Sequence, residues 1–108
     1  MPEAIEIQLK KGALELCVLA LLHQKDSYAY DIAARLADLI GMGEGTIYPL
    51  MRRLQNDGLV ETYLVESSAG PPRKYYKVSE AGKHSFVGQQ AAWASFSGAV
   101  NEILGGAK

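Results

Sequence analysis

The chain has 108 residues, of which 48% are hydrophobic and 21% are charged, and this composition is typical of one folded domain. No apolar run approaches the roughly 20 residues that a transmembrane helix needs, and the N-terminus lacks the pattern of a secretory signal peptide. The single cysteine, Cys17, cannot form an internal disulfide, and with His23 and His84 it lacks metal-ligand spacing. We therefore expect a small cytoplasmic protein that needs no metal and no cofactor.

The formal net charge of −1 argues against a strongly basic nucleic-acid-binding domain, for which a pI above about 9 is common. The charges are distributed unevenly, however. Residues 1–44 carry four basic and seven acidic side chains, whereas residues 45–83 carry six basic and four acidic ones. Any surface that attracts an anionic partner is therefore expected in the middle of the chain.

Hydrophobic periodicity predicts three helices in the first half of the chain. The first covers Ala4–His23 and is apolar on much of its surface. The second covers Tyr28–Ile40 and stops at the glycine-containing stretch 41–43. The third begins at Glu44, carries an apolar stripe, and ends at Asp57-Gly58, where glycine can supply the left-handed turn.

Two local features of these helices carry specific expectations. Asp26 or Ser27 can accept orphan backbone N–H groups and so cap the second helix. Pro49 should be tolerated only in the first turn of the third helix, so that helix is expected to start late or to bend there.

The second half of the chain predicts a hairpin followed by one long helix. The strands cover Leu59–Glu66 and Arg73–Val78, and alternation places only one tyrosine of the second strand in the core. Ser79 can cap a helix that runs from Glu80 to about Leu104. The expected fold is mainly α with a small antiparallel β-hairpin: a winged helix-turn-helix over residues 1–79 and a terminal helix over residues 80–108.

The exposed side of the third helix and the hairpin are the candidate nucleic-acid interface. If the apolar stripe packs inward, Arg52 points away from the core with Arg53 on its flank, a geometry that suits the DNA major groove. A solvated helix face explains the arginines equally well. A winged-helix module that binds protein and never DNA or a ligand is the main alternative, and the net charge slightly favours it.

Three motifs resemble the PadR family of bacterial transcription regulators: Tyr28-Ala29-Tyr30, Thr46-Ile47-Tyr48-Pro49 and Arg73-Lys74-Tyr75-Tyr76. The family keeps a proline inside its recognition helix. This resemblance implies a dimeric regulator, a repressor, that binds a pseudo-palindromic operator in double-stranded DNA. Ala29 departs from the family's glycine, and Pro71-Pro72 stands where relatives often carry glycine and arginine. The implied DNA-binding residues are Thr46, Tyr48, Pro49, Arg52, Arg53, Arg73, Lys74 and Lys77.

The last helix carries apolar residues at the spacing of a dimer seam. The expected interface consists of Phe86, Trp93, Phe96, Val100 and Ile103.

Trp93 is either a core residue of that seam or the aromatic wall of a ligand cavity at the dimer centre. Drug-sensing members of the family place a tryptophan at the matching position, and residues matching Leu9 and Leu16 line their cavity. The resemblance thus implies a small aromatic or hydrophobic effector, and a dimer without a ligand remains the alternative. No catalytic triad or phosphate loop is present, so we expect no enzyme activity.

Overall fold

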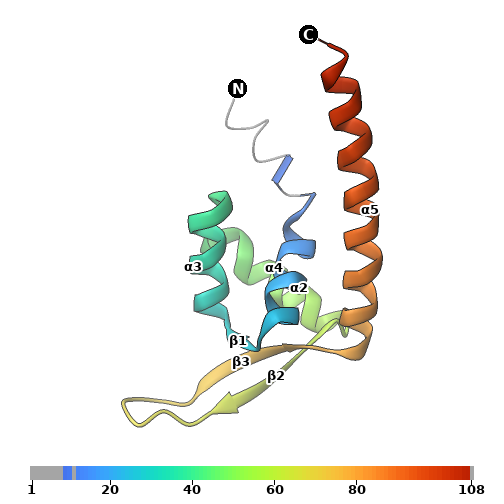
Figure 1. Ribbon diagram of the computed structural model, residues 1–108. Coiled ribbons are helices and arrows are strands. Elements are labelled where there is room, and N and C mark those ends of the chain that lie inside the picture. Colours follow the sequence, from blue (N-terminus) through green and yellow to red (C-terminus); the bar gives the residue numbers. More distant parts are fainter. Residues whose placement is uncertain (1–8, 11, 108) are drawn as a thin grey trace.

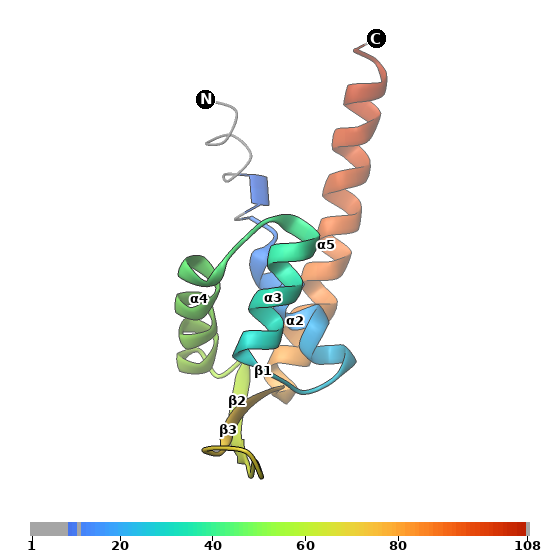
Figure 2. The ribbon, with the colours of Figure 1, turned by 90° about the vertical axis from the view of Figure 1, so that its left-hand side faces the viewer.

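The computed structural model describes residues 9, 10 and 12–107 (Figure 1). Three helices lie on one side of a small sheet, the hairpin projects from their base, and a long last helix rises beside them and past them (Figure 1). Figure 2, turned by 90°, also shows that the C-terminal end of the last helix rises clear of the other helices. The elements are α2 (Leu14–Gln24), β1 (Ser27–Tyr28), α3 (Ala29–Ile40), α4 (Glu44–Asn56), β2 (Val60–Val65), β3 (Arg73–Val78) and α5 (Glu80–Gly105).

The core lies between the helices and the inner face of the sheet. The stripe expected on α4, Ile47, Leu50, Met51 and Leu54, faces the core: three of its members are buried, and Leu50 is half-buried against them. Burial of such side chains contributes roughly 1.5–3 kcal/mol each to folding. The other fully buried members come from α2, α3 and the first strand of the hairpin: Val18, Leu19, Leu22, Ile32 and Val60.

The predicted ends of α3 and α4 are confirmed. Gly41 follows α3 with φ of 70°, and Gly58 follows α4 with φ of 76°, both in the left-handed region that glycine adopts without strain. The expectation that Pro49 delays the helix is wrong, because α4 begins at Glu44 and holds Pro49 in its second turn. The hydrogen bond that proline cannot make would have ended at the carbonyl of Gly45, an exposed residue where water can bind instead.

The first predicted helix is not continuous in the described residues. A turn at Gly12 and Ala13 separates Leu9 and Lys10 from α2, and the Ala13 N–H donates to the Lys10 carbonyl at 3.0 Å. Glycine costs a helix roughly 1 kcal/mol relative to alanine, which favours a break here. The expected stretch from Ala4 to residue 8 lies outside the described residues.

The sheet has three strands rather than the two expected. β1 pairs antiparallel with β3, in the order β1-β3-β2, with Ser27 opposite Tyr76 and Tyr28 opposite Tyr75. Ser27 and Asp26 therefore do not cap α3, whose N-cap is Tyr28 without a side-chain bond. Pairing with a distant strand has displaced the local capping interaction.

The hairpin agrees with the sequence pattern. β3 has the predicted bounds, and β2 is one residue shorter at each end than expected. Tyr76 is 6% exposed and Tyr75 is half-buried, which confirms that one tyrosine of this strand lies in the core.

The start of α5 is fastened to the end of α4 and the start of β2. The Ser79 hydroxyl caps α5 by accepting from the Gly82 N–H at 3.0 Å, as predicted, and donates to the Gly58 carbonyl at 2.6 Å. A Cβ on Gly82 would overlap the Leu59 carbonyl oxygen and press on Val78. This glycine permits the helix to lie directly against the sheet.

Replacing Gly82 with alanine is expected to lower the free energy of unfolding by about 1–3 kcal/mol, because α5 must move off the Leu59 backbone. Gly88→Ala is the matched control. A Cβ there meets nothing within 4 Å, so the substitution should stabilise α5 by up to about 1 kcal/mol. Urea denaturation of both variants measures the difference, and equal effects would contradict the packing argument.

Candidate functional site

The exposed side of α4 carries most of the residues predicted to read DNA. Pro49 and Arg52 are exposed, and Thr46 and Tyr48 are half-buried. The Arg52 side chain makes no hydrogen bond or ion pair with any residue that the structure describes. Its five N–H donors are therefore available to a base edge or a phosphate.

Tyr48 packs its ring against the edge of the core. Partial burial raises the pKa of the Tyr48 phenol, and the nearby carboxylate of Glu44 and the phenol of Tyr30 add to this rise. Because the ordinary phenol pKa is already near 10, the hydroxyl stays protonated at neutral pH. It can donate a hydrogen bond to an anionic oxygen.

Arg53 differs from Arg52 because it is already paired within the chain. Its Nη2 lies 2.9 Å from the Glu15 carboxylate of α2, and its Nη1 lies 3.4 Å from Asp57 at the end of α4. The sequence identified Arg53 as an exposed cation but contained no signal for its pairing with Glu15, 38 residues away.

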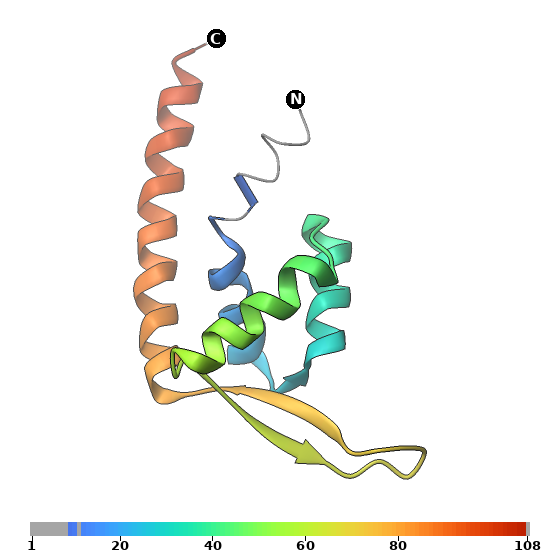
Figure 3. The ribbon, with the colours of Figure 1, turned by 180° about the vertical axis from the view of Figure 1, so that it is seen from behind.

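The three cations predicted for the hairpin do not form one patch. Arg73 and Lys77 lie on the outer face of β3, and Lys74 lies on the opposite face. The Arg73 guanidinium stacks over the Tyr28 ring at 4.8 Å from its centre, and the Lys74 ammonium lies 5.4 Å from the centre of the Tyr76 ring. Figure 3 shows the hairpin tip, which contains Pro71-Pro72, reaching away from α5.

A row of tyrosines crosses the outer face of the sheet. The ring centres of Tyr28 and Tyr75 are 5.6 Å apart, and those of Tyr75 and Tyr63 are 5.8 Å apart. The Tyr63 hydroxyl donates to the Asp26 carboxylate at 2.6 Å, and this bond raises the pKa of Tyr63. The row ties the hairpin to the linker before α3, a role that the sequence did not indicate.

The expected seam residues of α5 divide into two groups. Phe86 packs on the core, with its ring 4.8 Å from that of His23. Trp93, Phe96 and Ile103 are 49%, 65% and 73% exposed, and Val100 is half-buried. The exposed apolar residues thus lie in the second half of α5, between Trp93 and Ile103.

A shallow groove of about 260 Å³ runs between α5 and the start of α2. Two of the residues predicted to line an effector cavity, Trp93 and Leu16, meet here, whereas the third, Leu9, is 73% exposed and does not line the groove. The full lining comprises Gly12, Leu16, Gln89, Ala92, Trp93 and Phe96.

The Cys17 thiol has a pKa raised by burial, which keeps it protonated and supports a packing role.

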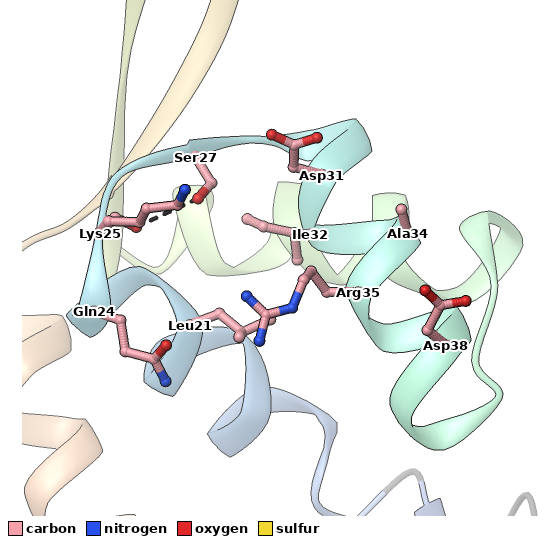
Figure 4. Close-up of a pocket in the computed structure, with 9 residues that line it drawn as sticks. All are labelled: Leu21, Gln24, Lys25, Ser27, Asp31, Ile32, Ala34, Arg35 and Asp38. Carbon is pink, nitrogen blue, oxygen red and sulfur yellow. Dashed lines mark hydrogen bonds between the residues drawn. The ribbon is translucent and has the colours of Figure 1, made fainter.

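Another hollow of about 270 Å³ lies between the end of α2 and α3 (Figure 4). Arg35 and Lys25 contribute positive charge to it, and Asp31 and Asp38 contribute negative charge. All four residues are exposed, and their charges offset one another, so this hollow does not favour an anionic partner. Among the described residues, no cluster of metal-ligating side chains occurs and no helix is suited to crossing a membrane.

Known proteins share this arrangement. The family model for the transcriptional regulator PadR-like family matches residues 18–87. A PadR-like transcription factor from Bacteroides fragilis is 42% identical, with a TM-score of 0.74 over 93% of this chain and 98% of that one. A PadR-like transcriptional regulator from Bacillus cereus is 36% identical, with a TM-score of 0.82 over 90% and 96%.

An uncharacterised protein from Lysinibacillus sphaericus is 30% identical over 98 residues, which cover 87% of this chain and 86% of that protein. PadR-like proteins are non-enzymatic regulators that bind DNA and typically dimerise. The family match covers more than half of the residues and includes α4, the hairpin and the start of α5. This chain belongs to the PadR-like family of transcriptional regulators.

Proposed function

We propose that the protein acts in the cytoplasm as a homodimeric repressor, which binds a pseudo-palindromic operator and releases it when a small aromatic or hydrophobic effector binds near Trp93. Residues 1–79 would form the DNA-binding unit, and residues 80–108 would form the dimerisation helix. The observation that carries this proposal is the exposed apolar stripe on the second half of α5, where Phe96 and Ile103 are 65% and 73% exposed.

A second copy is the occupant that best explains this stripe. Contiguous exposed apolar surface on a soluble domain is typical of an interface. Phe96 and Ile103 are seven residues apart on one helix face, which suits packing against the same face of a partner helix. Symmetry would then place two α4 helices on the two half-sites of an operator, about one helical turn apart.

In the proposed complex, α4 enters the major groove and Arg52 contacts a guanine edge or a phosphate. Thr46, Tyr48 and Pro49 would lie against the groove walls. Arg53, Arg73, Lys74 and Lys77 would contribute phosphate contacts, Arg53 only after it leaves Glu15. Arg73 and Lys74 lie on opposite faces of β3. The edge of the hairpin, rather than either face, would therefore contact a DNA strand.

The test is selection and sequencing of DNA fragments bound by the purified protein, followed by titration of the selected duplex at several salt concentrations. We expect an enriched inverted repeat and a logarithmic affinity that falls linearly with log salt. A protein-interaction module would enrich no sequence, and its affinity for duplex would be negligible at every salt concentration.

Binding of a flat aromatic compound in the groove is expected to quench or shift the emission of Trp93. This is a clean signal because the chain contains one tryptophan. A Leu16→Glu variant should lose the response, since Leu16 lines the groove with Trp93. Leu39→Glu is the control, because Leu39 is 64% exposed on α3 and does not line the groove. No response across a broad panel of compounds would favour a dimer without an effector.

A further inference from the structure

One carboxylate joins three helices. Glu15 of α2 accepts a hydrogen bond from Arg53 Nη2 of α4 at 2.9 Å through Oε1. Its other oxygen, Oε2, accepts from Gln89 Nε2 of α5 at 2.6 Å. The same Nε2 also donates to the Ser85 hydroxyl oxygen at 2.9 Å, and this second bond orients the Gln89 amide. The Glu15 side chain is 26% exposed, so it is partly shielded from solvent.

The two ends of this connection lie on the two surfaces described above. Arg53 belongs to α4, where with Thr46 and Pro49 it lines a hollow facing α2. Gln89 belongs to α5, where its side chain lines the groove beside Trp93. The groove is therefore connected to α4 by two consecutive hydrogen bonds, both of which are accepted by the Glu15 carboxylate.

The charge at Arg53 is already satisfied in the free protein. Its guanidinium faces Glu15 at 2.9 Å and Asp57 at 3.4 Å, so two carboxylates surround one cation. Because these two carboxylates offset its charge, the guanidinium attracts a DNA phosphate less strongly than an unpaired arginine does. The carboxylate and the phosphate are competing partners for the same group.

We propose that the ion pair with Glu15 keeps Arg53 from contacting DNA. The hydrogen bond from Gln89 to Glu15 makes the strength of this ion pair depend on whether the groove beside Trp93 is occupied. When the groove is empty, the Gln89 amide shares the charge of Glu15, and Arg53 can leave for a phosphate. When an occupant draws the amide away, Glu15 retains only Arg53, holds it more tightly, and DNA affinity falls. This inference rests on the proposed function and explains how an effector at Trp93 would weaken operator binding.

The first arm of the test measures duplex binding against salt concentration for the full chain and its Glu15→Gln variant. We expect the variant to bind a mixed-sequence 30-base-pair duplex about 2- to 5-fold more tightly, the range of an exposed ion pair. The slope of log affinity against log salt should steepen by up to about 0.9 per protomer, because Arg53 would neutralise a phosphate in every complex rather than in some of them. Adding Arg53→Gln to this variant should remove that gain.

The second arm asks whether Gln89 acts through Glu15. Gln89→Leu, which removes the amide from Glu15, should weaken duplex binding by about 2- to 5-fold in the natural chain. It should have no effect in the Glu15→Gln background. Gln90→Leu is the matched control, because Gln90 is exposed and does not line the groove, and it should change neither protein.

The outcomes separate this inference from the proposed function. If the natural chain binds duplex with ordinary salt dependence but Glu15→Gln leaves the slope unchanged, the inference is wrong and the proposed function stands. Additive effects of the Glu15 and Gln89 substitutions would overturn the connection in the same way. If the natural chain binds no duplex at any salt concentration, both fail. Far-ultraviolet circular dichroism and thermal unfolding verify that each variant remains folded.

Discussion

A variant with both Phe96→Glu and Ile103→Glu is expected to be a monomer and to bind the operator at least about 100-fold more weakly than the natural chain. In the proposed dimer, four carboxylates would be forced into an apolar seam, and burial of each unpaired charge costs several kcal/mol. The monomer would read one half-site and lose the contribution of the second. Light scattering gives the mass in solution, and titration of the selected operator gives the affinity.

The matched control for this variant is Val87→Glu. Val87 is 62% exposed, and at 100° per residue it lies about 180° around α5 from Phe96. The same change of an exposed apolar residue to glutamate should therefore leave both mass and affinity unaltered. A dimeric mass for the double variant, or a monomeric mass for the natural chain at micromolar concentration, would exclude α5 as the dimer seam.

Replacing Arg52 with alanine is expected to weaken operator binding by about 1–3 kcal/mol per protomer if the guanidinium reads a base. Arg52 is exposed, and its donors are unused among the described residues, so its loss leaves the fold unchanged and removes only intermolecular contacts. Binding to mixed-sequence duplex should fall less than binding to the operator, because base contacts contribute specificity. Operator and mixed duplexes titrated at one salt concentration give the ratio.

Two further variants interpret that result. Arg52→Lys keeps the charge but not the planar fork, so it should restore binding if the contact is to phosphate and fail to restore it if the contact is to guanine. Arg35→Ala removes an exposed arginine from α3, where it lines the hollow between α2 and α3, and should leave operator affinity within error (Figure 4). Equal losses for Arg52→Ala and Arg35→Ala would indicate a general electrostatic effect and would remove Arg52 from the reading surface.

Helices, hairpin and their ends could be predicted because the responsible interactions are local. The apolar stripe of α4, the left-handed glycines at positions 41 and 58, and the Ser79 cap each depend on residues within about one helical turn. Alternation along β3 likewise predicted that one of its two tyrosines enters the core, and the structure shows that it is Tyr76. The local rule for proline gave the wrong start for α4. The helix begins at Glu44 and includes Pro49, because packing of its apolar stripe outweighs one missing hydrogen bond.

The amino-acid sequence by itself determined the order of the helices and the hairpin, the family, and the arginines and lysines that α4 and the hairpin present to solvent. Only the tertiary structure decided the pairing of β1 with β3, the tyrosine row closed by Asp26, and the contact of Glu15 with Arg53 and Gln89. The reason is distance along the chain. Glu15 and Gln89 are 74 residues apart, and no spacing or propensity encodes which of many exposed polar groups will meet once the helices pack.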